Sequence, residues 1–268
     1  MNNMNNMNNA HNMLETVQSQ TIGQPFLAHK LHEEIASLPE SMRPQAAPQT
    51  WECVFGLLPP PCRILNVGAG RGGISWLLKE AGYDVVSVDL HPEHFVAEGL
   101  ECRHADLNRD LPFDEGIFDA VLAVEVIEHL ENPWNFIREA VRVLVPGGML
   151  LVTSPNVASL PSRFAYLGNG LFPYFREESF AGCYHATPIF PWTVERCCRT
   201  TSAIIERVAY SRIDWPRGND VPRHDGGRGL RRKLLDLLPL NRLTGEIACY
   251  SIRKVADGPD VVVGVHTG

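Results

Sequence analysis

The middle of the chain alternates short apolar runs with amphipathic stretches. RILNV (63–67) and DVVSVD (84–89) have the composition of buried strands, and the apolar residues of GGISWLLKEAG (72–82) between them recur at helical spacing. Three further strands are predicted at LECRHAD (100–106), FDAVLAVE (118–125) and GMLLVTSP (148–155). This order of strands and helices predicts an α/β fold with a parallel sheet and right-handed crossovers.

The pattern changes on both sides of this region. Two short helices are expected at 26–38 and 50–58, the second ending at three consecutive prolines. After the fifth strand, residues 156–191 are rich in Phe, Tyr, Gly and Pro and are predicted to be an irregular insertion. Strands at 202–211 and 246–255 have no helix pattern directly between them, so we expect them to pair antiparallel at the sheet edge.

These patterns divide the chain into four parts. Residues 1–24 are expected to be a disordered polar tail and 25–60 a helical cap. One α/β domain is expected at 61–257, with insertions at about 156–191 and 217–244. Residues 258–268 are expected to be a flexible tail.

Composition narrows the class of protein. The net charge is −7, although 196–254 carries 13 Lys/Arg against 6 Asp/Glu. This balance argues against a protein that binds nucleic acid as a whole. The 7 cysteines lack paired spacing, and the N-terminus has no charged region followed by an apolar core, so we expect a reduced, cytoplasmic protein.

A glycine cluster follows the first strand, at the position where a nucleotide binds in many α/β proteins. Gly68, Gly70 and Gly73 satisfy G-x-G-x-x-G, and Asp89 ends the next strand about twenty residues later. This motif alone fits a nicotinamide dinucleotide, a methyl-donating adenosyl sulfonium, or tight strand–helix packing without a ligand.

Acidic residues at the ends of the next strands favour the methyl donor. Asp106 ends the third strand beside Leu107, where a carboxylate can accept a hydrogen bond from an adenine amino group and a leucine can pack on the ring. The fourth strand runs into EVIEHLENP (125–133), which places Glu125 and its neighbours in the ligand crevice of an open sheet.

NVGAGRGG, SVDL, ADLNRDLPF, FDAVLAVEVIEHLENP and VLVPGGMLLVTSPN together resemble the class I S-adenosylmethionine-dependent methyltransferases, over roughly residues 62–156. The small-molecule branch that includes ubiquinone-biosynthesis O-methyltransferases is the most similar. The resemblance implies a Rossmann-like three-layer sandwich with a seven-stranded, mostly parallel sheet and an antiparallel last strand. It also implies S-adenosyl-L-methionine as the cofactor and methyl transfer to a small-molecule acceptor as the activity.

The resemblance assigns cofactor-binding roles to named positions. It implies that Gly68, Gly70 and Gly72 form a shelf for the methionine part, which Glu125 approaches. It further implies that Asp89 holds the ribose hydroxyls, and that Leu90, Asp106 and Leu107 surround the adenine. Asn66 departs from the family pattern, which usually has Glu or Asp there, so we expect weaker cofactor binding rather than loss of activity.

Two histidines are candidate catalytic bases, because a phenol or alcohol must lose its proton during methyl transfer. His129 follows the fourth strand, and His185 lies in the aromatic insertion, where this fold builds its acceptor pocket. Either histidine can instead be structural, and the insertion's aromatic residues can form a lid or only its own core. No metal is expected, because the spacing of Glu125, Glu128 and His129 is not a standard zinc pattern.

The acceptor is expected to be a small molecule, either apolar or lipid-linked, and not a nucleic acid. A basic amphipathic stretch at 228–240 fits a contact with an anionic membrane surface, or packing onto its own domain. The alternatives to a methyltransferase are a nicotinamide-dependent oxidoreductase and a methyltransferase-like domain that binds partners without catalysis.

Overall fold

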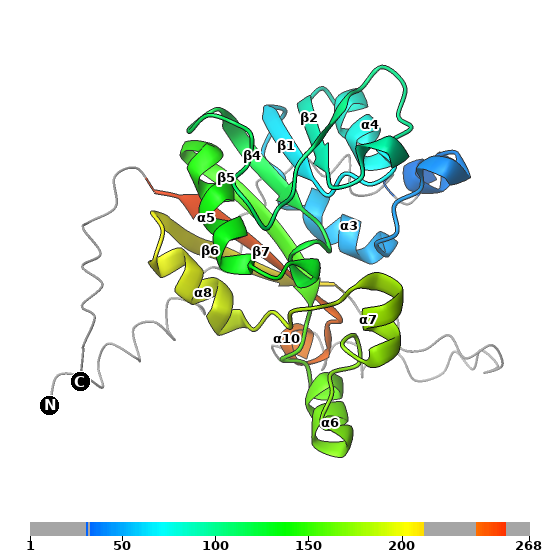
Figure 1. Cartoon of the computed structure of the whole chain (residues 1–268), viewed down its shortest axis with the longest axis vertical. Coiled ribbons are helices and arrows are strands. Elements are labelled where there is room, and N and C mark those ends of the chain that lie inside the picture. The colour runs from blue at the N-terminus through cyan, green and yellow to red at the C-terminus, as the bar shows by residue number, and fades with distance from the viewer. Residues whose placement is uncertain (1–30, 32, 212–239, 256–268) are drawn as a thin grey trace, which may run out of the picture.

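The computed structural model describes residues 31, 33–211 and 240–255. One seven-stranded sheet crosses this part of the molecule, in the order β3-β2-β1-β4-β5-β7-β6 (Figure 1). Its strands are β1 (Arg63–Val67), β2 (Asp84–Asp89), β3 (Cys102–His104), β4 (Phe118–Ala123), β5 (Leu144–Pro155), β6 (Ala203–Tyr210) and β7 (Ile247–Lys254). The predicted β1 and β2 have these same bounds, whereas β3 is shorter than expected.

The direction of the strands confirms the fold class. β1 pairs in parallel with β2 and β4, and the pairs β2–β3 and β4–β5 are parallel as well. β7 lies between β5 and β6 and is antiparallel to both. The sheet is therefore mostly parallel, and the last strand of the chain is the reversed one.

Helices cover both faces of the sheet and make three layers. Alternate strand residues point to opposite faces, so Ile64 and Leu122 contact one layer while Leu65 and Val121 contact the other. α3 (Pro48–Phe55) and α4 (Gly73–Glu80) pack on the first face, together with helical residues 33–37. α5 (Pro133–Val143) and α8 (Pro191–Arg199) pack on the second face.

Local signals explain where these helices start. Asn132 caps α5 by accepting a hydrogen bond from the Asn135 amide at 3.1 Å, and Pro133 occupies the first turn. α4 begins after Gly72, whose φ of 90° lies in the left-handed region that favours glycine.

The segment between β5 and β6 differs from its prediction. Residues 156–191 contain two helices, α6 (Leu160–Asn169) and α7 (Glu177–Cys183), so the prediction of an irregular insertion is wrong. Ser159 caps α6, and Gly170 ends it with a φ of 75°. β5 is also longer than the predicted 148–155, because its pairing with β4 already includes Leu144.

The connection from β6 to β7 leaves the sheet at Ser211 and returns to it at Ile247, and these two residues contact each other. The Ser211 amide donates to the Ile247 carbonyl at 2.9 Å, and the Ile247 amide donates to Ser211 Oγ at 3.1 Å. The last described helix, α10 (Leu240–Thr244), leads into β7. The predicted membrane-contact stretch at 228–240 and both predicted tails lie outside the described residues, apart from Leu240.

No helix in the described part of the chain combines the length and the apolar character needed to cross a lipid bilayer. The predicted division into four parts stays a prediction.

Candidate functional site

Four strands end next to one another at one edge of the sheet and carry the predicted cofactor residues. Gly68 follows β1, Asp89 ends β2, Asp106 follows β3 and Glu125 follows β4. Because these strands are parallel neighbours, their carboxyl ends share this edge. This is the position of the ligand crevice in open α/β sheets.

The glycine turn after β1 is fixed by its backbone and by Asp89. Gly70 has a φ of 54°, and a Cβ added there would meet no heavy atom within 4 Å, so its backbone borders open space. Its amide donates to Asp89 Oδ2 at 2.8 Å. Asp89 Oδ1 accepts from the His91 amide at 2.8 Å, which sets the orientation of the carboxylate.

Asp106 also has its orientation set by its own loop. It accepts hydrogen bonds from the Asn108 amide at 3.0 Å and from Arg109 Nε at 3.2 Å. Leu107 beside it is buried, whereas Leu90 at the end of β2 is 51% exposed. Leu90 is therefore available to a ligand at this edge, and Leu107 belongs to the core.

Asn66 faces α4 and takes part in a buried polar network. Its Nδ2 donates to Ser75 Oγ at 2.9 Å, and Ser87 Oγ donates to the same hydroxyl at 2.9 Å. All three side chains are buried, so the network joins β1, β2 and the first turn of α4 below the glycine turn.

Glu125 holds a strained position where β4 ends. Its backbone φ is 51°, a conformation that residues other than glycine rarely adopt. Its amide donates to Thr153 Oγ1 of β5 at 2.8 Å, and its carboxylate accepts from Thr50 Oγ1 of α3 at 3.1 Å. Burial raises the pKa of this carboxyl, and the bond from Thr50 opposes that rise.

The fold brings Glu128 and the two predicted catalytic histidines together. Glu128 and His129 belong to the short helix η3 (Ile127–His129), and one possible ligand atom of each lies within 4.8 Å of the other and of one on His185. The two imidazole rings meet edge to face at 4.8 Å between centroids. Burial raises the pKa of Glu128 to about 8, and the nearby Glu125 adds to that rise. Burial also lowers the pKa of His185.

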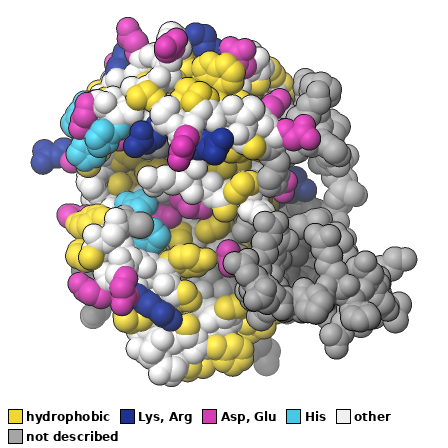
Figure 2. All heavy atoms as spheres, turned by 90° about the vertical axis from the view of Figure 1, so that its right-hand side faces the viewer, with side chains coloured by type: hydrophobic (Ala, Val, Ile, Leu, Met, Phe, Trp, Pro, Cys, Tyr) yellow, Lys and Arg dark blue, Asp and Glu magenta, His cyan; other side chains and the backbone are white. Residues whose placement is uncertain are grey.

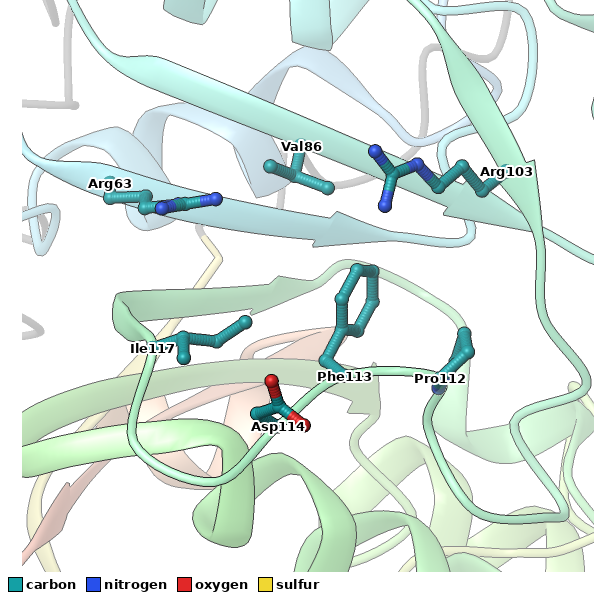
Figure 3. A pocket seen from close by; sticks show the side chains of 7 residues that line it. All are labelled: Arg63, Val86, Arg103, Pro112, Phe113, Asp114 and Ile117. Atoms are coloured by element: carbon teal, nitrogen blue, oxygen red, sulfur yellow. The ribbon is translucent and has the colours of Figure 1, made fainter.

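A separate cavity of about 400 Å³ lies away from these residues. Arg63 and Arg103 approach it from the strands, and Phe113 approaches it from the loop before β4 (Figure 3). Arg63 is the first residue of β1, so this cavity opens toward the amino ends of the strands. It is not part of the site at the carboxyl edge.

Comparison with known protein families shows which kind of domain this part of the sheet resembles. The family model described as "Methyltransferase domain" matches residues 65–152, which run from β1 to β5 and include the glycine turn, Asp89, Asp106 and Glu125. Residues 65–152 are therefore similar to a methyltransferase domain.

Curated relatives are similar to this chain over only part of its length. Ubiquinone biosynthesis O-methyltransferase of Caulobacter sp. (strain K31) is 34% identical over 103 residues, which cover 35% of this chain and 41% of the relative. Demethylmenaquinone methyltransferase of Tropheryma whipplei (strain Twist) is 34% identical over 107 residues, 38% of this chain and 44% of the relative. The chain thus spans less than half the length of these relatives.

Solved structures extend the likeness of the fold beyond the methyltransferase domain. A methyltransferase of Thermotoga maritima, described as S-adenosylmethionine-dependent and a possible histamine N-methyltransferase, covers 85% of this chain and 98% of its own, with a TM-score of 0.52 and 19% identity. A chain of the Haloferax volcanii complex between the Trm112 activator and a putative methyltransferase covers 86% of this chain and 90% of its own, with a TM-score of 0.52 and 16% identity. Fold and domain match together confirm the resemblance to class I methyltransferases.

The sequence missed two residues at this edge, Thr50 and Thr153, and gave no role to a third, Glu128. Thr50 and Thr153 hold Glu125, and Glu128 is fully buried beside the histidines. Nothing in the sequence pairs Thr50 with Glu125, because the contact joins helix α3 to a strand end 75 residues later. Glu128 did carry a signal in the sequence. It follows the apolar Ile127 just after a buried strand, and a charged side chain is expected to be buried there only when it has a partner or a function.

Proposed function

We propose that this protein transfers a methyl group from S-adenosyl-L-methionine to a small-molecule acceptor. The observation that carries the proposal is the match of residues 65–152 to a methyltransferase domain whose glycine turn and Asp89 lie together at the carboxyl edge of the sheet. Methyl transfer from a sulfonium mainly requires that the acceptor atom, the methyl carbon and the sulfur be held in line.

Each residue at the edge has a role in this proposal. Gly68, Gly70 and Gly72 give the methionine part a backbone surface, with positive φ at all three. Asp89 binds the ribose hydroxyls with lone pairs that its bonds to Gly70 and His91 leave free. In this proposal Leu90 lies beside the adenine, Asp106 binds its amino group and Glu125 approaches the methionine part. Leu107 and Asn66 support these contacts from the buried side.

The acceptor in this proposal carries an apolar ring. Aromatic side chains of the segment after β5 contact one another, with Tyr166 and Phe172 stacked at 4.8 Å and Phe172 edge to face with Phe190 at 5.7 Å. Hydrophobic side chains are exposed around the end of the molecule where Figure 1 places α6 and α7 (Figure 2). The names of the curated relatives, which concern ubiquinone and demethylmenaquinone, suggest a quinone-type ring rather than a nucleic acid.

His129 and His185 are the proposed catalytic bases. His129 follows the end of β4 and contacts His185 of the aromatic segment, and each ring meets a backbone carbonyl through Nδ1. The lowered pKa of His185 keeps the ring neutral near pH 7, as a base requires.

Calorimetric titration tests the cofactor. S-adenosylhomocysteine should bind in the micromolar range, and NAD should not bind. Asp89→Asn should weaken S-adenosylhomocysteine at least about 10-fold, because bonds between charged groups and hydroxyls contribute about 1.5–3 kcal/mol.

Asp84→Asn is the matched control. It lies at the other end of the same strand, where its carboxylate pairs with Arg63 at 3.6 Å, so it should leave cofactor affinity unchanged. Binding of NAD in place of S-adenosylhomocysteine would establish an oxidoreductase. Binding of neither would favour a methyltransferase-like domain that works through protein contacts.

A second assay tests the acceptor. Isotope-labelled S-adenosylmethionine should transfer label to a phenol or hydroquinone with an apolar side chain, and not to RNA or DNA of any sequence. Transfer to nucleic acid alone would overturn the acceptor class and leave the cofactor assignment intact.

A further inference from the structure

The cavity at the amino ends of the strands lies between the sheet and a strand connection that has no α-helix. Residues 90–101, between β2 and β3, and 105–117, between β3 and β4, contain only one short 3₁₀ helix, η2 (Pro92–His94). The loop 105–117 packs over the second face of the sheet instead. The space left between this loop and the strands has a volume of about 400 Å³, which is typical of small-molecule sites.

Two arginines from different strands point into this cavity. Arg63 begins β1 and Arg103 lies in β3, on either side of β2. Leu65, two positions after Arg63, pairs with Val86, and Val88, two positions after Val86, pairs with Arg103. Because strand residues two positions apart share a face, both arginines lie on the same face as Val86, which is midway between them. Figure 3 shows their guanidinium groups directed toward each other from the two sides of Val86.

Both guanidinium groups have free hydrogen-bond donors. The Arg103 side chain makes no hydrogen bond or ion pair with any residue in the described part of the chain. Arg63 approaches Asp84 only through Nε, at 3.6 Å, and its guanidinium lies 5.6 Å from the centroid of the Phe118 ring. An arginine can bind a carboxylate or a phosphate through two parallel hydrogen bonds. The two side chains can therefore hold an oxyanion between them.

The wall opposite the arginines is apolar and keeps its position without a ligand. Phe113 meets Phe118 edge to face at 5.1 Å between ring centroids. The Phe113 carbonyl accepts from Arg142 Nη1 at 2.9 Å, and the Ile117 amide donates to the Val143 carbonyl at 2.9 Å. Both partners belong to α5, so this helix holds the loop in place. The cavity is thus preformed, with an apolar wall facing two cations.

We propose that this cavity binds a small organic anion, a carboxylate or phosphate monoester that carries an apolar ring. Its oxyanion lies between Arg63 and Arg103, and its ring lies against Val86 and Phe113. Asp114 lines the loop side of the cavity, so its charge repels a ligand that is negative at both ends, or a polyanion such as RNA. The site opens toward the opposite ends of the strands from Asp89 and does not depend on the proposed methyl transfer.

Calorimetric titration of the full-length protein with phenyl phosphate and with benzoate tests the site. At least one of the two should bind at a single site, and the tighter one identifies the oxyanion. Benzyl alcohol has the ring without the charge, and inorganic phosphate has the charge without the ring. Each should bind at least about 10-fold more weakly than the tighter ligand.

Two substitutions in the cavity should act in opposite directions. Arg103→Gln should weaken the tighter ligand at least about 10-fold, because it removes a charged hydrogen-bond donor. Asp114→Asn should tighten the same ligand by roughly threefold, because it removes a repelling charge. Both side chains are exposed, so the thermal midpoints should match the wild type. A general loss of folding would lower affinity in both variants.

Arg199→Gln is the matched control, because it removes an exposed arginine of α8 that does not line the cavity. It should leave the affinity for the anion unchanged. Equal weakening by Arg199→Gln and Arg103→Gln would show that the net charge attracts the anion, and the proposal would be wrong. The absence of binding by both phenyl phosphate and benzoate would also overturn it.

A titration in the presence of S-adenosylhomocysteine separates this site from the proposed cofactor site. The anion should bind equally well with and without S-adenosylhomocysteine, because the two sites lie at opposite ends of the strands. Displacement of the anion would place it at the carboxyl edge and contradict the proposal. Binding of the anion by a protein that binds no S-adenosylhomocysteine would count against the proposed methyl transfer and leave the anion site standing.

Discussion

Asn66 reaches the cofactor side of the sheet only through its neighbours. Its amide is 4% exposed and donates to Ser75 Oγ, which lies in the first turn of α4. A side chain there acts on a ligand through its charge and through the position of the glycine turn. The side-chain amide of Asn66 can hold the glycine turn in position, but it adds no charge.

Asn66→Asp should therefore tighten S-adenosylmethionine by roughly fivefold, about 1 kcal/mol, because a carboxylate in a buried setting attracts the cationic sulfonium and ammonium groups. The Ser75 hydroxyl can turn its hydrogen toward the new carboxylate, and the α4 N-terminus favours a negative charge. S-adenosylhomocysteine, which lacks the sulfonium charge, should gain less. Calorimetry with both compounds measures the difference.

Asn66→Ala is the control for position. It removes the bond to Ser75 without adding charge, so it should lower the free energy of unfolding by about 1–3 kcal/mol and tighten neither compound. An equal gain with both compounds in Asn66→Asp would mean that the sulfonium is not near this position.

At the scale of elements, α5 holds the loop that carries Asp106. Glu139 of α5 accepts from the Leu111 amide at 2.9 Å and from Arg142 Nη2 at 2.8 Å. Arg142 also donates to the carbonyls of Leu111 at 3.0 Å and Phe113 at 2.9 Å. These bonds tie the loop between β3 and β4 to the helix.

Glu139→Gln should lower the free energy of unfolding by about 1–3 kcal/mol at pH 7. The bonds from Arg142 hold the pKa of Glu139 below its usual value. A lowered folded-state pKa stabilises the protein above the unfolded-state pKa of about 4.3, and this contribution is lost as the pH falls through the folded-state pKa. Denaturant unfolding at pH 7 and below pH 4 should show the difference between wild type and variant shrink.

Glu195→Gln on α8 is the matched control, since Glu195 and Arg199 form an exposed ion pair four residues apart. Such pairs contribute about 0.3–0.5 kcal/mol, so this variant should show little change at either pH. A Glu139→Gln variant with the same small effect would mean that the loop does not depend on α5.

The elements that the sequence predicted well are those with local signals. β1 and β2 combine apolar runs with bounding turns, and the apolar residues of α4 recur at helical spacing. α6 also had such signals, with Ser159 as its cap and Gly170 at its end, but the aromatic and Pro-rich composition of its segment outweighed them. α7 ends at Tyr184 with a φ of 56° and no glycine, so its end had no local signal.

The site was predictable only where it follows strands. Gly70 follows a predicted strand and Asp89 and Asp106 end predicted strands, and the shared edge of a parallel sheet brings the three together. The cluster of Glu128 and His129 with His185 depends on contacts across 56 or more residues of sequence, which hydrophobic pattern does not encode.

At the scale of the whole molecule, the two halves of the sheet differ in what they hold. β1, β2 and β3 carry the residues around the proposed cofactor, and α3 closes over the end of β4 through the bond from Thr50 to Glu125. β5, β7 and β6 form the other half, where α10 contacts β6 and α6. A change in one half should leave the other intact.

Replacing residues 213–238 with a short Gly/Ser linker should test this independence. Because Ser211 and Ile247 are hydrogen-bonded to each other, the linker closes a loop whose ends already meet. Each halving of loop length changes the closure cost by only about 0.6 kcal/mol, so loop closure itself should change stability by no more than about 1 kcal/mol. Thermal unfolding and S-adenosylhomocysteine affinity should match the wild type. A large loss of affinity would show that the replaced residues reach the cofactor side.

Ile247, where the β6–β7 connection returns to the sheet, also pairs with Pro155 at the end of β5. Both ends of the β6–β7 connection leave the sheet at the carboxyl end of β5, the same edge as the glycine turn. That connection can therefore vary in length and sequence, and so change the surroundings of the proposed acceptor, while the half of the sheet around the proposed methyl-donor site stays unaltered. The hydrogen bonds between Ser211 and Ile247 thus mark where a variable connection joins the rest of the sheet.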